Sequence, residues 1–348
     1  NENTRLIDFQ WSEPKNLRFN EFYKDKILND KNIDLLIETA ITKIDGNLNV
    51  ETAQLFDHKT KKYYTIRPKV IILACGAIEN SRILLYSKKE SKSHFLKNIS
   101  VGKDYLIHPN YIVAKSLIDM SKIEKILDNG YMNFGMFFLS PTKNFIEEKK
   151  IGNVGLRIMV NHYPSKTKEL LKDLLCIAPK YAKKIAALGD KKIDCANLKF
   201  FSSWEALPSD TNYITLDENE VDNLGIPRVK VFANLNDDTK KTMRLFLEEV
   251  GKFFIDKKIG RLAVRDFLYP NQNIWPKDGY GGAHQMGGTK MGFSNLDSVV
   301  DKNLRAHGIN NLFILGSSVF PTGGHANPTF TICQLAVRLG NHLEKKFS

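Results

Sequence analysis

A histidine and an asparagine near the C-terminal end of the sequence could carry out proton chemistry together. His284 lies in a glycine-rich segment, residues 281–292, and an imidazole suits a base because its unperturbed pKa is near neutrality. Asn327 stands directly before Pro328, and its carboxamide could hydrogen-bond an oxygen and orient it. Each residue also has an ordinary interpretation. A histidine in a glycine loop is often structural, and an asparagine before proline is often only a helix cap.

The segment around Asn327 predicts the start of a helix that ends near residue 344. Asn327 fits the N-cap and Pro328 the first helical position, and apolar residues then recur at helical spacing. A helix start exposes free N–H groups and a partial positive charge, which suit an anion. Residues 311–315 predict a buried strand, and the glycines of residues 281–292 would let the backbone approach a flat ligand closely.

The first third of the chain predicts a parallel sheet. Residues 69–77 are an apolar run that predicts a strand buried on both faces, and residues 77–87 predict a helix. The strand and the helix meet at Gly76, and parallel sheets hold nucleotides at strand-to-helix junctions of this kind. A further strand is predicted at residues 33–44 and a short amphipathic helix at residues 20–28.

Residues 111–270 have a different pattern, in which strands are clustered with packing helices. Strands are predicted at residues 133–139, 155–160, 212–216 and 228–232. Helices are predicted at residues 166–187 and 237–254. This arrangement predicts an α+β domain with an antiparallel sheet.

Composition excludes several classes. The net charge of +12 comes mostly from scattered lysines without a nucleic-acid motif, which indicates a solvated surface rather than a nucleic-acid partner. No apolar run reaches the roughly 20 residues of a membrane helix. The four cysteines, Cys75, Cys176, Cys195 and Cys333, are far apart, which predicts reduced, buried thiols in a cytoplasmic protein and no metal site. The first residue is Asn, which suggests a processed or incomplete chain.

Together these segments resemble the glucose–methanol–choline (GMC) flavoprotein oxidoreductases. The resemblance rests on a His-x-x-Gly-x-x-x-Met-Gly motif that begins at His284, on an Asn-Pro-Thr motif that begins at Asn327, and on residues 76–85, 101–109 and 311–322. The Asn-Pro-Thr version looks most like the branch that contains pyranose 2-oxidase and the sugar dehydrogenases.

The resemblance implies an α/β plus α+β fold. Residues 1–110 and 271–348 would form a discontinuous, partial FAD-binding domain (Rossmann-like, GMC/PHBH-type), and residues 111–270 an antiparallel-sheet substrate-binding domain. The family's N-terminal ADP-binding βαβ unit, with its Gly-x-Gly-x-x-Gly motif, is absent from the sequence. The chain would therefore be the C-terminal portion of such an enzyme, and would need the missing N-terminal half or a partner chain.

The same resemblance implies roles for individual residues. His284 would be the base and Asn327 its hydrogen-bonding partner in the oxidation of a sugar, polyol or similar alcohol, with hydride transfer to FAD N5. The residues implied to contact FAD are Ile41, Gly76, Gly316, Ser317, Pro328 and Thr329.

Several alternatives remain open. Ile41 could be an ordinary core residue, and His325 could line the pocket or be a second polar contact. His108, in a segment that matches the family, is interpreted as structural rather than catalytic. The alternative function is a non-catalytic binding module or partner subunit that lacks FAD.

Overall fold

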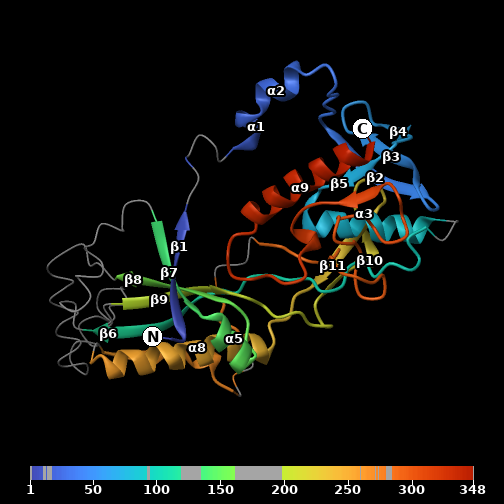
Figure 1. Cartoon of the computed structure of the whole chain (residues 1–348). Coiled ribbons are helices and arrows are strands. Elements are labelled where there is room, and N and C mark those ends of the chain that lie inside the picture. The colour runs from blue at the N-terminus through green and yellow to red at the C-terminus, as the bar shows by residue number, and fades with distance from the viewer. Residues whose placement is uncertain are drawn as a thin grey trace, which may run out of the picture. The chain divides into compact units, whose positions relative to one another are not determined.

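The computed structural model describes residues 2–10, 13, 18–91, 95–118, 135–160, 198–258, 260–270, 272, 274–279 and 284–347. The chain packs into two compact units (Figure 1): residues 1–11, 109–205 and 235–281 form the first, and residues 12–108, 206–234 and 282–348 form the second. The predicted helix at residues 166–187, the thiols of Cys176 and Cys195, and residues 281–283 of the glycine-rich segment lie outside the described residues.

The first unit is built on a six-stranded antiparallel sheet in the order β1-β7-β8-β9-β6-β12. Its strands are β1 (Thr4–Gln10), β6 (Asn110–Ile118), β7 (Gly135–Pro141), β8 (Val154–Val160), β9 (Leu198–Trp204) and β12 (Gly260–Val264). The N-terminal strand β1 lies at one edge, paired with β7 along its whole length. The sheet confirms the antiparallel character predicted for the middle of the chain.

Helix α8 (Asp237–Asp256) supplies much of the core of this unit. The side chain of Asn236 caps it by accepting a hydrogen bond from the N–H of Thr239 at 2.9 Å. Its apolar face buries Met243, Phe246, Leu247, Val250 and Phe254 against the sheet residues of one hydrophobic cluster. The helix thus confirms the amphipathic pattern of the sequence. Among the described residues of the unit, the other helices are α5 (Lys143–Lys149) and the 3-10 turn η2 (Asp266–Leu268).

The second unit combines small sheets with two long helices. Strands β2 (Thr39–Gly46), β3 (Val50–Asp57) and β4 (Lys62–Ile66) form an antiparallel sheet, β5 (Ile71–Leu73) and β13 (Leu312–Ile314) pair in parallel, and β10 (Tyr213–Val221) and β11 (Pro227–Phe232) form a hairpin. The helices in the described part of this unit are α1 (Phe19–Phe22), α2 (Lys24–Asn29), α3 (Gly76–Glu90) and α9 (Thr329–Phe347), with the 3-10 turn η3 (Ser317–Val319).

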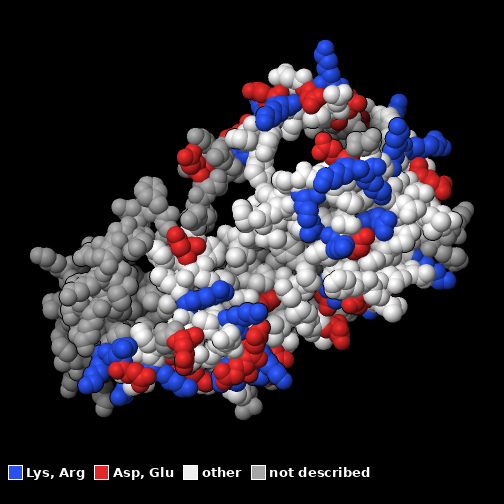
Figure 2. All heavy atoms as spheres, in the orientation of Figure 1, with Lys and Arg blue, Asp and Glu red and all other residues white. Residues whose placement is uncertain are grey.

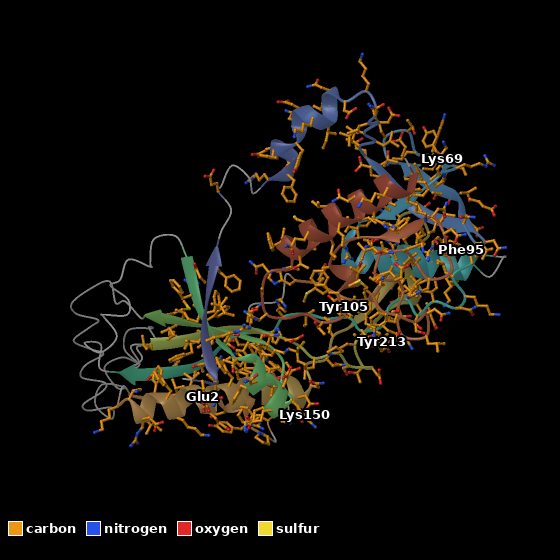
Figure 3. The ribbon with its side chains drawn as sticks, viewed as in Figure 1. Glu2, Lys69, Phe95, Tyr105, Lys150 and Tyr213 are labelled. Atoms are coloured by element: carbon orange, nitrogen blue, oxygen red, sulfur yellow. The ribbon has the colours of Figure 1, made fainter. Side chains whose placement is uncertain are left out.

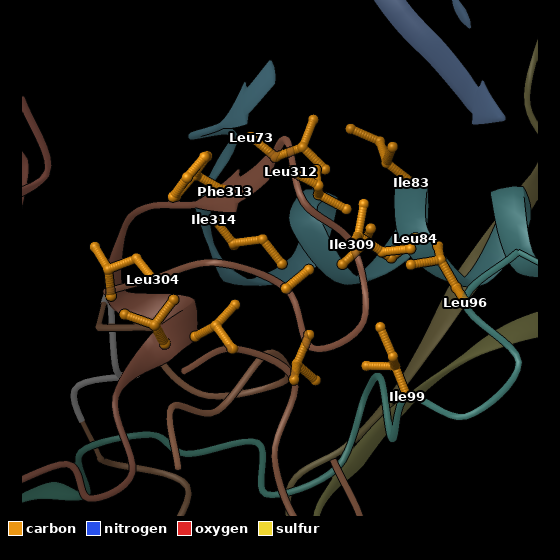
Figure 4. Packing of buried hydrophobic residues seen from close by; sticks show 14 of the residues in the cluster. Leu73, Ile83, Leu84, Leu96, Ile99, Leu304, Ile309, Leu312, Phe313 and Ile314 are labelled. Atoms are coloured by element: carbon orange, nitrogen blue, oxygen red, sulfur yellow. The ribbon is translucent and has the colours of Figure 1, made fainter. Parts of the chain in front are cut away.

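The core of the second unit forms between the parallel strands and α3. Figure 4 shows Leu73 of β5, Leu312 and Ile314 of β13, and Ile83 and Leu84 of α3 gathered in one cluster. These side chains are buried to 5% exposure or less. Burying each removes apolar surface from water, which stabilises the fold by roughly 1.5–3 kcal/mol per side chain.

Strand β5 departs from the sequence prediction. The run at residues 69–77 was expected to be buried on both faces, but regular strand covers only Ile71–Leu73 and Ile72 is 44% exposed. Cys75 is also exposed, so the prediction of a buried thiol is wrong at this position. Successive side chains of a strand point to opposite faces, so Leu73 faces the core while Ile72 points to the other face. No described residue covers Ile72 or Cys75.

The surface carries charges of both signs. Figure 2 shows Lys and Arg interspersed with Asp and Glu on the visible face of each unit, as expected for a solvated surface. Within the described part of the chain, no helix combines the length and apolar character needed to cross a membrane. Among the same residues, no group of three or more His, Cys, Asp and Glu side chains is arranged to hold a metal ion.

Asn311 connects three segments of the second unit, and we expect its replacement to be costly. Its Oδ1 accepts from the N–H of Val50 at 2.7 Å, while its Nδ2 donates to the carbonyls of Val50 and Lys69 at 3.0 and 3.2 Å. Asn311→Ala leaves buried backbone groups without partners, so the free energy of unfolding should fall by about 2–4 kcal/mol. Urea unfolding measures this, with the exposed neighbour Asn310→Ala as control, for which the change should stay within about 0.5 kcal/mol. Equal effects of the two variants would contradict the assignment.

Candidate active site

The loop that carries His284 is held on one side by a ladder of backbone hydrogen bonds. Met286 and Leu106 exchange both N–H···O=C bonds, at 2.8 and 3.0 Å. Gly288 continues the ladder with two bonds to residues 102–103, at 2.7 and 3.1 Å. The loop is therefore positioned by main-chain geometry along the segment that ends at His108.

The partner segment is itself attached to β10. The N–H of Ile214 donates to the carbonyl of Gly102 at 2.7 Å, and the N–H of Tyr105 donates to the carbonyl of Asn212 at 3.1 Å. Figure 3 shows Tyr105 and Tyr213 close to each other on these two segments. The support of His284 thus extends from the loop through residues 102–106 to the hairpin.

On its other side the loop follows η3. The N–H of Gly287 donates to the carbonyl of Ser317 at 3.1 Å, and two further N–H···O=C bonds follow at 3.0 and 2.9 Å. The hydroxyl of Ser317 donates to the carbonyl of Gln285 at 2.6 Å. Ser317, predicted to contact FAD, therefore uses its hydroxyl to hold the His284 loop. Its hydroxyl oxygen can still accept a hydrogen bond, and the contact with FAD stays a prediction.

Two glycines of the loop are required by close packing within the protein. Gly287 has φ +73°, and a Cβ there would lie 1.9 Å from the carbonyl oxygen of Asp104. Gly288 has φ +88°, and a Cβ there would lie 2.4 Å from Oγ of Ser81. The sequence suggested that these glycines admit a flat ligand, whereas the atoms that crowd them belong to neighbouring segments of the chain.

His284 contacts a second, buried histidine. The Nδ1 atoms of His284 and His108 are 3.0 Å apart, and the rings meet edge to face with centroids 5.1 Å apart. His108 is only 1% exposed, and its Nε2 lies 3.1 Å from the carbonyl oxygen of Gly323. His284 is half-buried. The sequence assigned His108 a structural role and did not indicate that it touches the predicted base.

Burial keeps both rings neutral near pH 7. It lowers the pKa of His108 to about 4, although the backbone of Gly323 and Gly324 favours the charged form. Burial also lowers the pKa of His284 below its ordinary value. A neutral imidazole holds a lone pair that can accept a proton, so His284 is in the state that a base requires.

The segment from Gly323 to Asn327 leads from this histidine pair to α9. Helix α9 begins at Thr329, one residue later than predicted, since Ile332 donates to the carbonyl of Pro328 at 3.0 Å. Asn327 is exposed, four positions beyond the glycine that contacts His108. The loop of His284 and the chain leading to Asn327 therefore meet at one buried ring, and the pairing of His284 with Asn327 stays a prediction. His325 lies in the same segment and is half-buried.

Gly76 and Gly316 lie where the two parallel strands end. Gly76 opens α3 directly beyond β5 with φ +84°, and Gly316 follows β13 with φ +125°. A Cβ at either position would meet no atom within 4 Å. Both glycines thus border open space at the carboxyl edge of the parallel pair, where such sheets bind nucleotides.

Asn80, from the first turns of α3, joins these two strand ends. Its Oδ1 accepts from the N–H of Cys75 at 2.9 Å. Its Nδ2 donates to the carbonyl of Leu315 at 3.2 Å and to Oγ of Ser318 at 2.9 Å. The sequence places Asn80 in a motif but does not reveal this contact, because its partners are distant along the chain.

Ile41 lies in β2, opposite Leu55, at a bulge that shifts the register before Lys43. Its side chain is half-buried and packs against the core of the second unit. The side chain therefore has the ordinary core role that the sequence left open. The predicted backbone contact with adenine remains a prediction.

Comparisons with known proteins agree with the motifs. The model of the GMC oxidoreductase C-terminal domain, described as GMC oxidoreductase, matches residues 208–336, a range that contains His284 and Asn327. This part of the chain is therefore similar to the C-terminal domain of the GMC oxidoreductases.

Two curated relatives extend the similarity upstream. The chain is 27% identical over 301 residues to 2-methyl-1,2-propanediol dehydrogenase of Mycolicibacterium austroafricanum, covering 85% of this chain and 51% of that protein. It is 25% identical over 299 residues to the fructose dehydrogenase large subunit of Gluconobacter japonicus, covering 82% of this chain and 49% of that subunit. The chain spans about half the length of the relatives it matches.

Solved structures share the fold. Pyridoxine 4-oxidase from Mesorbium loti superimposes with a TM-score of 0.55 at 13% identity, over 94% of this chain and 61% of that one. A variant of formate oxidase from Aspergillus oryzae RIB40 gives a TM-score of 0.54 at 13% identity, over 92% of this chain and 62% of that one. The chain therefore shares its mixed helix and sheet architecture with both of these structures.

Gly287→Ala tests whether the loop depends on close packing. The new Cβ would collide with the carbonyl of Asp104, so the free energy of unfolding should fall by at least about 2 kcal/mol. Gly308→Ala is the matched control, because it also has positive φ (+76°) but meets no atom within 4 Å, and it should cost only about 1 kcal/mol. Chemical denaturation of the two variants measures the difference, and a milder effect at 287 than at 308 would contradict the packing argument.

The buried ring of His108 predicts a pH dependence of stability. The pKa of His108 is about 4 in the folded protein and 6.5 in the unfolded chain. At a pH between these two values, the ring binds a proton only when the chain is unfolded. The free energy of unfolding should therefore fall, by up to ~3 kcal/mol, as the pH drops from 6.5 to 4. His108→Asn should flatten this part of the pH curve, while the exposed His58→Asn should leave it unchanged. The test is the urea midpoint of each variant measured from pH 4 to 6.5. If the midpoint of His108→Asn depends on pH as steeply as that of the parent, His108 is not the source of the pH dependence.

Proposed function

We propose that this chain supplies the catalytic residues of a FAD-dependent oxidoreductase that acts on CH–OH groups of a sugar, polyol or similar alcohol. The observation that carries the proposal is the neutral, half-buried His284, fixed against buried His108 beside the ends of two parallel strands. A base held in one place next to a nucleotide-binding edge is what alcohol oxidation by a flavin requires.

The residues at that edge fit FAD. Open space borders Gly76 and Gly316, whose positive φ values leave no side chain in the way. Together with the backbone of Ile41 and Ser317, they would line the dinucleotide. Pro328 and Thr329 would present the start of α9 to the flavin ring, since a helix N-terminus favours negative charge by ~0.3–1 kcal/mol when exposed.

When bound, FAD accepts the hydride from the alcohol carbon. His284 removes the hydroxyl proton, because its neutral ring holds a lone pair at neutral pH. Asn327 hydrogen-bonds the same oxygen and keeps the carbon oriented. His325 adds a polar contact to the same pocket. The similar proteins named as acting on a diol and on fructose support an alcohol or sugar as substrate.

FAD binding is proposed to be shared with a further segment, either in the same polypeptide or in a partner chain. The chain spans about half of its relatives, and apolar residues of the second unit are exposed: Ile72 by 44%, Val337 by 65% and Phe330 by 72%. Apolar surface of this kind favours a covering segment. The alternative is a binding module without FAD, for which the same exposed residues would provide the interface.

Binding of FAD distinguishes the oxidoreductase from the binding module. The purified chain is titrated with FAD, alone and together with the remaining half of a relative, and flavin absorbance and fluorescence are followed. FAD binding under either condition supports the oxidoreductase; a protein that stays colourless under both supports the binding module.

The flavin-loaded protein is then mixed anaerobically with a panel of sugars and polyols, and flavin bleaching is measured. His284→Ala should slow bleaching by about 10²–10⁴-fold without changing FAD affinity. His307→Ala, in another loop of the same unit, should have no effect. For the parent, the bleaching rate should fall about tenfold per pH unit below the pKa of His284, which lies under 6.5. Unchanged bleaching in His284→Ala would remove the assigned role.

A further inference from the structure

The hydrogen bonds around His108 have only one consistent direction. A carbonyl oxygen can only accept, so the Nε2 of His108 that faces Gly323 at 3.1 Å must carry the proton. A neutral imidazole has one N–H and one lone pair, so the Nδ1 of His108 must then be the lone pair. That Nδ1 lies 3.0 Å from the Nδ1 of His284, which must therefore be the donor.

We propose that buried His108 is a positioning residue that fixes the tautomer of His284, placing its proton on Nδ1 and leaving the lone pair on Nε2. The direction of the bonds follows from the contacts of the buried His108 ring and from its neutral state. The consequence for catalysis, that Nε2 of His284 is the atom that receives the substrate proton, rests on the function proposed above.

The surroundings of His108 hold this arrangement in place. The ring is 1% exposed, so water cannot supply a competing donor or acceptor at Nδ1. The backbone ladder between residues 102–106 and 286–288 fixes the loops on which the two histidines lie. Gly323 packs against the pair as well, since a Cβ there would lie 3.2 Å from Cε of Met286 and 3.7 Å from Nε2 of His108. The contacts of the His108 ring with Gly323 and with His284 are thus set by the fold.

An alternative arrangement would require a charged His108. If both nitrogens of that ring donated, the Nδ1 of His284 would have to accept, and its proton would move to Nε2, where it would block the base. The neutral state of His108 is therefore what makes His284 a proton acceptor on the correct atom. In a serine-protease triad, a histidine held in the wrong tautomer lowers kcat by about 10⁴, which shows how much such positioning can contribute.

Nitrogen-15 NMR of the histidine rings tests the proposal without any flavin. In the parent chain, His284 should show a protonated Nδ1 and a free Nε2, and His108 the reverse. In His108→Gln and His108→Ala, His284 should shift toward the Nε2–H form that free histidine prefers. His108→Asn can keep an amide oxygen near the position of Nδ1, so it should restore the Nδ1–H form of His284. His307→Gln serves as a matched control, because its ring contacts Ser298 in a different loop, and should leave His284 unchanged.

The resonances of His307 and the urea midpoint report whether each His108 variant is folded. If His284 in the parent carries its proton on Nε2, or if its tautomer is the same in folded His108→Gln as in the parent, the proposal is overturned.

The catalytic consequence is read separately in the flavin-loaded protein. His108→Gln should slow flavin bleaching by at least about tenfold, and His108→Asn should recover most of the loss. If the tautomers are as proposed but the parent oxidises no alcohol, the proposed function fails while the positioning role stands. If the parent oxidises alcohols and His108→Gln bleaches at the parent rate, the positioning role in catalysis is overturned.

Discussion

The candidate site depends on the ladder of main-chain hydrogen bonds between residues 102–106 and 286–288. Without it, the loop of His284 would be a glycine-rich connection with many accessible conformations. The ladder places the loop between the β10 hairpin on one side and η3 on the other, and brings His284 to His108. Because main-chain bonds need no particular side chain, this arrangement leaves only an indirect trace in the sequence: glycines at the positions where a Cβ would collide.

Buried polar side chains complete the framework around the ladder. Asn80 links the ends of β5 and β13, and Asn311 links the start of β13 to β3 and to the chain before β5. A buried amide whose donors and acceptors are all used specifies one arrangement of its neighbours, because any other arrangement leaves polar groups without partners. The edge that borders Gly76 and Gly316 is therefore shaped by two asparagines that do not themselves face open space.

Sequence reasoning succeeded where a single segment determines the outcome. The apolar spacing of residues 237–254 predicted α8, and the Asn-Pro-Thr motif predicted α9 to within one residue. It failed where the outcome depends on what lies beside a segment. The apolar run before Gly76 indicated burial, but Ile72 and Cys75 are exposed, because only the face of β5 that carries Leu73 packs against the core. The contact between His108 and His284 was not predicted, because nothing in residues 101–109 reveals that the loop of His284 lies against them.

The order in which the chain visits its two units has a consequence for its synthesis. Each unit is assembled from three separate stretches, and β1 is made well before β7, its neighbour in the sheet. The parallel partner of β5 is β13, which leaves the ribosome only after every stretch of the first unit. Neither unit can complete its core before its last stretch has been made, and such distant pairings fold slowly. We therefore expect the nascent chain to expose apolar strands for much of its synthesis, and chaperones to contribute strongly to its yield in cells.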